Sequence, residues 1–546
     1  MTPPARFRAM LAADLELGAG NVLLRLAEHG ADLDEPRVAF DTPVDGFAPF
    51  TLLSLRDLTR LAAARADWFR AKGIGRRDPV ALYVTDAADV FLNFFALCRL
   101  GAIPALMNGN MPLDVAVTYI QRLRCSGVVT DAAHAQVARS DLGAPVLGDA
   151  AETGTGDPQG APEHFRHTGD DPVAITHSSG TTRVPAAVVH SHHSLFAAIR
   201  AVRLTEPRPY GHVRELSALP AAHAAGLITI NQALCNGYEL FCLSAQGGSS
   251  RDGAEAVLDA IERWRPTGVF GFAVTWAEMA RFDLGARDMS SVRNWFNTGD
   301  CAHETHIRRL VAVGSHREPT AEGSRLVPGS KFIDSLGSTE MGHSAFFMTH
   351  QLGSEKYERC VGRTFPFAEI KLLDPATGRE VPDGAVGQAA LRSPTLAPGY
   401  WNDSPSTYRS RLNGYYLTGD LMYRDGEGLY YHVDRASDAV DLGGGEWLYT
   451  ALTEERILKR CPDVRDCTVV AGRGPDGAPT ADVLLLLAAD ADPDADRHHA
   501  VLAALGSAAD RVQCRVMSVS DDDLLVGPTG KVRKFLMRQR LVAAAD

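Results

Sequence analysis

Helical and strand-like segments alternate between residues 52 and 107. Residues 58–72 have the spacing of a helix, and the apolar residues 80–84 follow as a predicted strand. Residues 88–99 are predicted to form a second helix, which leads into the apolar residues 101–106. Helix and strand that alternate in this way indicate a parallel or mixed α/β sheet.

Composition narrows the class of protein. The 546 residues suffice for more than one domain, since a domain usually has ~100–200 residues. A hydrophobic content of 45% and a charged content of 22% are typical of a soluble globular protein. A net charge of −12 argues against binding to nucleic acid or to an anionic membrane. Nine scattered cysteines without a Cys-x-x-Cys motif favour free thiols, so we expect a cytoplasmic protein.

Residues 178–194 read Ser-Ser-Gly-Thr-Thr-Arg-Val-Pro-Ala-Ala-Val-Val-His-Ser-His-His-Ser, and they begin with a glycine flanked by hydroxyl side chains. A loop of this kind points backbone N–H groups and hydroxyls at phosphate oxygens. The stretch resembles the phosphate loop of the adenylate-forming superfamily, which includes acyl-CoA synthetases, luciferases and nonribosomal adenylation domains. The resemblance implies that Thr181 and Thr182 bind the nucleotide. A surface loop unrelated to phosphate is the alternative.

Three residues of this loop depart from the family pattern. Arg183 and Ala187 stand where glycine is usual, and Ala186 stands where a lysine is usual. Losing one preorganised contact to developing charge typically slows a reaction by a factor of ~10²–10³. The changes therefore predict that adenylation from ATP is weak or lost.

A second motif covers residues 334–340, Asp-Ser-Leu-Gly-Ser-Thr-Glu, and resembles the family's Tyr-Gly-x-Thr-Glu motif. The resemblance implies that Thr339 holds the adenylate phosphate, that Glu340 binds Mg²⁺ and that Gly337 and Ser338 contact the nucleotide. Leu336 stands where the family has a tyrosine that stacks on adenine. A helix-capping turn would also account for the motif.

Further motifs follow in the family's order. Residues 415–421 resemble its Thr-Gly-Asp segment, which implies that Asp420 accepts hydrogen bonds from the ribose. Residues 434–438 resemble the interdomain hinge, in which Arg435 contacts the nucleotide. Residues 527–533 resemble the C-terminal Pro-x-x-Gly-Lys motif, in which Lys531 bridges the acid and the α-phosphate. Lys531 argues against complete loss of adenylation.

The remaining matches concern the substrates. Residues 219–227 resemble the acyl-pocket motif, with His223 between the acyl pocket and the route of the thiol. Asp300 lies where the family's adenine-side backbone runs. Gly443 and Gly444 match glycines beside which the pantetheine arm of CoA passes, because close approach needs residues without a Cβ. A tight hairpin is the alternative for this glycine pair.

The resemblance implies a mixed α/β adenylate-forming fold. We expect a large N-terminal domain, residues 1–436, and a small mobile C-terminal α+β domain, residues 437–546. The implied enzyme is an acyl-CoA ligase of a bacterial natural-product pathway that converts a bulky apolar acid to its CoA thioester through acyl-AMP. The cofactors would be acyl-AMP or ATP, CoA and Mg²⁺.

The mixed state of the motifs favours the second half-reaction, in which acyl-AMP reacts with CoA. The partners would be the small-molecule carboxylic acid or its adenylate and a separate adenylating enzyme. Two alternatives stay open for the activity: a complete two-step ATP-dependent ligase, and a non-catalytic acyl-nucleotide binding protein. A carrier protein in place of CoA and a homodimer also stay open, and no nucleic acid or membrane is expected.

Overall fold

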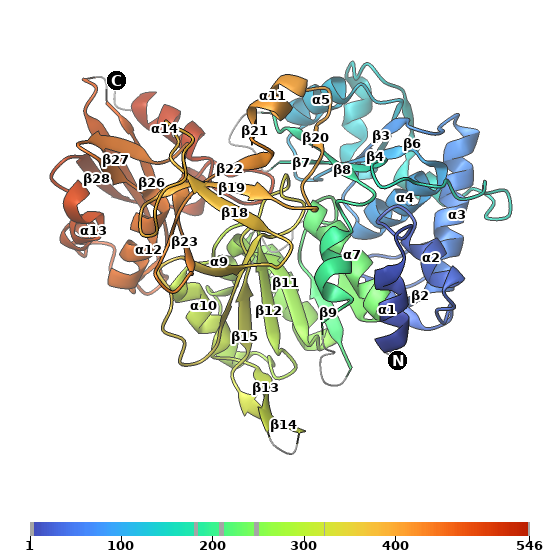
Figure 1. The fold of residues 1–546 in the computed structure, drawn as a ribbon, viewed down its shortest axis with the longest axis horizontal. Helices are drawn as coiled ribbons and strands as arrows, with labels where there is room; N and C mark the ends of the chain where they lie inside the picture. The colour runs from blue at the N-terminus through green and yellow to red at the C-terminus, as the bar shows by residue number, and fades with distance from the viewer. Residues whose placement is uncertain are drawn as a thin grey trace.

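The structure is a computed structural model and describes residues 5–178, 184–206, 212–244, 250–320, 323–474 and 476–543. Figure 1 shows the C-terminal part of the chain, in dark orange to red, at the left of the larger N-terminal part, whose colours run from blue to light orange. The two parts meet along one side of the central strands, and the candidate site lies there.

The first sheet belongs to the N-terminal part. Its spatial order is β20 (Gly399–Tyr400), β8 (Ala187–Ser191), β7 (Pro172–His177), β4 (Ile103–Met107), β3 (Pro79–Tyr83), β5 (Gly127–Thr130) and β6 (Val146–Asp149). The strands from β7 to β6 run parallel, whereas β8 is antiparallel to β7. The predicted alternation over residues 52–107 is confirmed, with α3 (Leu55–Ala71) and α4 (Ala87–Leu100) beside β3 and β4.

The sequence explains where these two helices begin and end. Ser54 and Asp57 form a capping box at the start of α3. Gly101 has φ +69° just after α4, and a side chain there would meet the ring of Phe165. A left-handed residue without a Cβ ends the helix and lets β4 begin two residues later.

The second sheet is mixed and extends through the centre of the molecule. Its order is β18 (Glu369–Leu373), β19 (Gly387–Arg392), β22 (Tyr415–Arg424), β23 (Tyr430–Arg435), β17 (Cys360–Thr364), β16 (Phe346–His350), β15 (Lys331–Asp334), β12 (Asn294–Thr298), β11 (Gly268–Phe272), β9 (Arg214–Ser217), β10 (Glu239–Cys242), β1 (Pro36–Phe40) and β2 (Leu53–Ser54), and β21 (Arg411–Leu412) pairs with β22. The strands from β15 to β1 are parallel. Ligands bind beyond the carboxyl ends of parallel strands in open α/β sheets, so this half of the sheet is the place for a site.

Helices cover the central sheet. In Figure 1, α7 (Ala224–Asn236) lies near β9 and β11, and α10 (Glu304–Val311) lies near β12 and β15. The other helices of the N-terminal part are α1 (Ala5–Ala13), α2 (Val22–Glu28), α5 (Leu113–Leu123), α6 (Ala150–Thr153), α8 (Arg251–Trp264), α9 (Ala273–Met279) and α11 (Ser404–Arg409). Within the described ranges, no helix is long and apolar enough to span a membrane.

The C-terminal part has its own sheet and its own apolar core. The sheet has the order β26 (Val464–Arg473), β27 (Pro479–Leu487), β28 (Gln513–Ser518), and it packs with α12 (Thr450–Arg460), α13 (His498–Leu505) and α14 (Lys534–Ala543). The predicted glycine hairpin is confirmed as β24 (Val440–Gly443) and β25 (Glu446–Leu448). A separate two-stranded antiparallel ladder is formed by β13 (Ser315–Thr320) and β14 (Gly323–Pro328).

Candidate functional site

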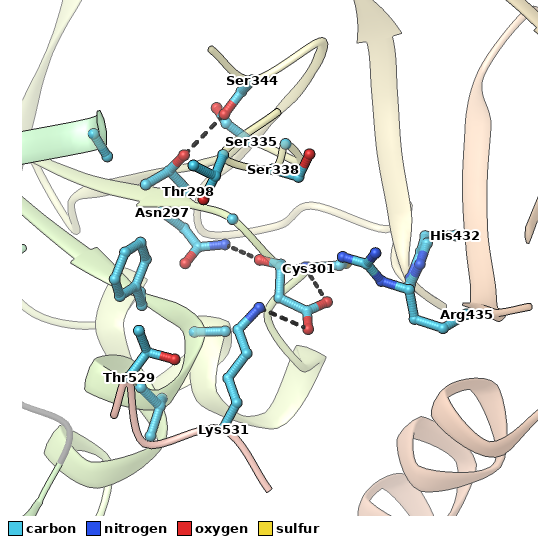
Figure 2. Close-up of a pocket in the computed structure, with 18 of the residues that line it drawn as sticks. Asn297, Thr298, Cys301, Ser335, Ser338, Ser344, His432, Arg435, Thr529 and Lys531 are labelled. Atoms are coloured by element: carbon cyan, nitrogen blue, oxygen red, sulfur yellow. Dashed lines mark hydrogen bonds and ion pairs between the residues drawn. The ribbon is translucent and has the colours of Figure 1, made fainter. Parts of the chain in front are cut away.

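A cavity of about 740 Å³ opens at the carboxyl ends of β11, β12 and β15. Its walls come from these strand ends, from α7 and from residues 529–534 of the C-terminal part. Figure 2 shows Lys531 reaching into the cavity from the segment that carries Thr529, with His432 and Arg435 beyond it. The cavity brings together most of the residues that the sequence predicted for the site: His223, Asp300, Gly337, Ser338, Thr339, Glu340, Arg435 and Lys531.

Lys531 and Asp300 link the two parts of the chain at the floor of the cavity. The Lys531 Nζ atom lies 3.3 Å from Asp300 Oδ2, and the Arg359 guanidinium lies 3.3 Å from Asp300 Oδ1. Burial would raise the pKa of Asp300, but the charges of Lys531 and Arg359 outweigh it and hold that pKa well below 3.8. Asn108 Nδ2 donates to the Pro528 carbonyl at 3.2 Å and secures the segment before Lys531. These contacts therefore hold the lysine in the cavity, within reach of a bound phosphate or carboxylate.

His223 and Thr339 are in contact in the cavity wall, next to the part of the cavity that Phe270, Phe272 and Phe296 line. His223 caps α7, because its Nδ1 accepts from the Ala225 N–H at 3.1 Å. Burial lowers the pKa of His223 to about 3, so the ring is neutral at neutral pH. A neutral imidazole has one acceptor and one donor nitrogen, so Nε2 donates toward Thr339 Oγ1 at 3.3 Å. The pair offers polar hydrogens and no charge at this point.

The turn after β15 positions the remaining predicted nucleotide residues. A Cβ on Gly337 would lie 2.7 Å from the Ser344 Cα, so the turn needs glycine there. The Tyr400 hydroxyl donates to Glu340 Oε1 at 3.2 Å and orients that carboxylate. No group of three or more His, Cys, Asp or Glu side chains that could hold a metal ion occurs in the described part of the chain.

Asp420 lies behind the wall rather than on it. It faces Arg435 as a cross-strand pair of β22 and β23, with Asp420 Oδ1 2.9 Å from Arg435 Nε and 3.3 Å from His432 Nε2. Burial alone would raise the pKa of Asp420, but the charge of Arg435 and the hydrogen bond of His432 outweigh burial and hold that pKa below 3.8. Arg435 and His432 line the cavity, whereas Asp420 is 1% exposed.

Besides Asp420, two predicted residues that the structure describes, Gly443 and Gly444, do not line the cavity. Thr181 and Thr182 lie outside the described residues, as does Arg183. Gly443 and Gly444 form the β24–β25 turn with φ +83° and +66°, away from the cavity lining. Left-handed geometry at both accounts for glycine in this conformation.

Part of the cavity wall was not predicted from the sequence. Leu336 is 1% exposed and lies in the core. Of the alanines around His223, Ala221 and Ala222 lie in the core, whereas Ala224 and Ala225 line the cavity. The missed lining includes Phe270 and Phe296, whose stacked rings are 4.5 Å apart. The sequence pattern that could have identified them is the alternation of side chains along a strand. Phe270 and Phe272 on β11, and Phe296 on β12, share one face of the sheet with Thr298.

Glu455 joins α12 to the start of α10 and connects the two parts of the chain. Its carboxylate accepts from the Glu304 N–H at 3.0 Å and lies 2.6 Å from His303 Nδ1. Burial lowers the pKa of His303, but the hydrogen bond and charge of Glu455 outweigh it and raise that pKa above 6.5. The charged pair therefore stabilises the protein below pH 6.5 and loses its contribution as pH rises through the elevated pKa of His303.

We expect Glu455→Gln to lower stability by about 1.5–3 kcal/mol at pH 6, the range for a hydrogen bond to a charged group. Thermal melting at pH 6 and pH 9 checks this, with Lys459→Met as the control for an exposed ion pair of the same helix. An equal loss at both pH values would contradict the assignment.

Comparisons with known proteins agree with this geometry. Residues 34–401 match the family model of the AMP-binding enzymes. A 3-aminoavenalumate diazotase of Streptomyces sp is 41% identical over 98% of both chains, and a 3-hydroxybenzoate–CoA ligase of Aromatoleum sp. (strain CIB) is 26% identical over 87% of this chain and 89% of its own. The crystal structure of an anthranilate CoA ligase with anthranoyl-AMP superposes with a TM-score of 0.80 at 19% identity, covering 97% of this chain and 98% of that one. The chain belongs to the AMP-binding enzyme family, with the adenylate-forming fold of the acyl- and aryl-CoA ligases.

Proposed function

We propose that this chain is an ATP-dependent diazotase that converts an amino-substituted aromatic carboxylate to its diazo derivative. The observation that carries the proposal is the 41% identity, over 98% of both chains, to a diazotase whose named substrate is an amino-substituted carboxylate. The stacked Phe270 and Phe296 support a flat aromatic substrate, because aromatic pairs favour offset and edge contacts with a third ring.

The chemistry suits an adenylate-forming site. A diazo group needs a second nitrogen at the oxidation level of nitrite. Nitrite is a bent anion with two oxygens, as a carboxylate is, so one nitrite oxygen can attack the α-phosphorus of ATP and displace pyrophosphate. The amine nitrogen then attacks the activated nitrogen, AMP leaves, and one proton is released to give the N-nitroso amine. Uptake of one proton and loss of water complete the diazonium ion.

The residues in the cavity fit these roles. Lys531 would bind the attacking anion and the α-phosphate, and Asp300 holds it in place at 3.3 Å. Arg435 would contact the nucleotide, and Thr339 the phosphate. Mg²⁺ keeps few protein carboxylates when it bridges phosphates, so Glu340 alone fits it, and the ion would neutralise phosphate charge. His223 would orient the amine through its neutral ring.

We propose further that the hinge near residue 436 divides residues 1–436 from a mobile domain of residues 437–546. Lys531 lines the cavity, where it would take the role in adenylation that the resemblance implies. This position supports ATP use despite Ala186 and Ala187, where the family has lysine and glycine. Ala186 exchanges two hydrogen bonds with Ser178, at 3.0 and 3.2 Å, across the base of the loop and keeps the strands paired there.

CoA thioester formation is the second candidate, favoured by the aryl-CoA ligase among the relatives. In this case Gly443 and Gly444 would line the path of CoA in another domain pose, and the altered phosphate loop would favour acyl-AMP made by a separate adenylating enzyme. We expect the first activity and not this one.

One assay separates the candidates. The purified protein receives 3-aminocinnamate with ATP, Mg²⁺ and either nitrite or CoA, and in a third reaction synthetic acyl-AMP with CoA. We expect a diazo product, detected by azo coupling, and nitrite-dependent pyrophosphate release. Thioester from acyl-AMP and CoA without any diazo product would overturn the proposal and support the thioester half-reaction. Thioester from ATP and CoA would support a complete ligase.

A further inference from the structure

The aromatic part of the cavity is a long slot between α7 and the central sheet. Ala225, Ile228, Thr229 and Gln232 face it from successive turns of α7, and Phe270 and Phe296 face it from β11 and β12. From His223 to Gln232 the helix rises about 13 Å, at 1.5 Å per residue. A substrate with its reacting group beside His223 can therefore extend a ring and a short chain toward Gln232.

A second cavity of about 110 Å³ lies at the far end of this slot. Arg203, Gln232 and Phe296 line both cavities, so they form the passage between them. Most of the residues that line the second cavity carry polar or charged side chains. Its other lining residues are Arg8, Glu206, Val213, Glu215, Asn236, Tyr238, Thr267, Gly268, Arg293 and Asn294.

This far chamber contains polar atoms that the protein does not satisfy. Glu215 is 4% exposed, and its Oε2 atom has no hydrogen-bond partner among the described residues. The Nε atoms of Arg203 and Arg8 are also buried there, and neither has a partner among the described residues. Leaving a buried polar group unpaired costs about 1–3 kcal/mol, and such groups in native proteins usually have a ligand or water. The chamber is thus suited to a small polar group.

The charge in the chamber selects an anion. Arg8, Arg203 and Arg293 supply three positive charges, against the carboxylates of Glu206 and Glu215. Glu206 and Arg203 are paired, since Glu206 Oε2 lies 3.3 Å from Arg203 Nη1, and the Arg203 Nε atom remains without a partner among the described residues. Burial raises the pKa of Glu215 to about 8, so at pH 7 it is mostly protonated and can donate a hydrogen bond. A carboxylate would find cationic and neutral donors here.

We propose that Arg203 and Gln232 bind the carboxylate of the aromatic substrate at the end of the slot remote from Lys531. The proposal rests on the diazotase function and deepens it. A substrate held in this way presents its amino group to His223 and Thr339 and keeps its carboxylate away from the nucleotide. An acid-activating ligase needs the opposite orientation, with the carboxylate at the α-phosphate. The orientation would direct the enzyme to nitrogen chemistry.

The test measures binding without turnover. Calorimetric titration with saturating AMP and no nitrite gives dissociation constants for 3-aminocinnamate, for its methyl ester and for the shorter 3-aminobenzoate. The proteins are the wild type, Arg203→Met, Arg203→Lys and Gln232→Leu. Arg203→Lys keeps the positive charge. Gln232→Leu removes the side-chain amide at similar size, and it tests the subsite if Arg203→Met fails to fold.

In the wild type we expect the acid to bind about ten- to a hundredfold tighter than the ester, as for a hydrogen bond to a charged group. The preference should disappear in Arg203→Met, return in part in Arg203→Lys and shrink in Gln232→Leu. 3-Aminobenzoate should bind more weakly, because it cannot reach Arg203. Equal binding of acid and ester by the wild type, or no binding of either, overturns the subsite. A preserved preference in both Arg203→Met and Gln232→Leu overturns it as well. Absence of diazo product alongside an Arg203-dependent preference overturns the diazotase function and leaves the subsite standing.

Discussion

Lys531→Met should lower nitrite-dependent pyrophosphate release and diazo formation together, by a factor of ~10²–10³, the usual cost of one preorganised contact to developing charge. The Lys531 ammonium lies 3.3 Å from Asp300 at the cavity floor, and methionine fills a similar volume without charge. Asp300 keeps Arg359 as a partner at 3.3 Å, so the variant should fold.

Lys459→Met is the matched control. Lys459 also belongs to the C-terminal part and faces the N-terminal part, with Nζ 3.6 Å from Glu304 Oε2, but its side chain is 54% exposed and lies outside the cavity. Both reactions should stay near the wild-type rate in this variant. Pyrophosphate release by Lys531→Met within threefold of the wild type, in a protein of normal melting temperature, would remove Lys531 from the chemistry.

Local patterns in the sequence were sufficient for part of this site. Lys531, Thr339 and Glu340 belong to short motifs whose chemistry is carried within a few residues, and the cavity includes all three. The helix predicted over 88–99 agrees with α4, Ala87–Leu100, because Gly101 marks its end. Motifs of this kind do not depend on distant packing.

Other parts of the site depend on contacts between distant segments. Arg203 lies on the helical turn Ile199–Arg203, and only the fold brings it to Gln232 and Phe296. Leu336 stands where the family has a tyrosine that stacks on adenine, and it packs with Met341 and Phe346 in the core. A sequence shows the type of a residue at each position, but the direction of its side chain depends on the register of the sheet.

Asp420 is the clearest case of a predicted residue with a different position. The ribose contact predicted for it would be direct, whereas the structure places its carboxylate behind Arg435, with Oδ1 2.9 Å from Nε. We expect Asp420→Ala to weaken AMP binding about ten- to a hundredfold, the range for loss of a hydrogen bond to a charged group. The variant either loses a ribose contact or frees Arg435 from its position.

The comparison of AMP with 2′-deoxy-AMP separates these two causes. Calorimetry gives the dissociation constants of both nucleotides for the wild type, Asp420→Ala and Asp420→Asn. These values form a thermodynamic cycle between the Asp420 side chain and the ribose 2′-hydroxyl. If Asp420 binds the ribose, only the wild type discriminates between the two nucleotides. If Asp420 acts through Arg435, each variant weakens both nucleotides equally, and we expect this result because Asp420 is 1% exposed and Arg435 lines the cavity. The lowered pKa keeps Asp420 charged above pH 4, so its effect should be constant from pH 6 to pH 9. AMP affinity within threefold of the wild type in Asp420→Ala would exclude both roles and move the nucleotide away from β22 and β23.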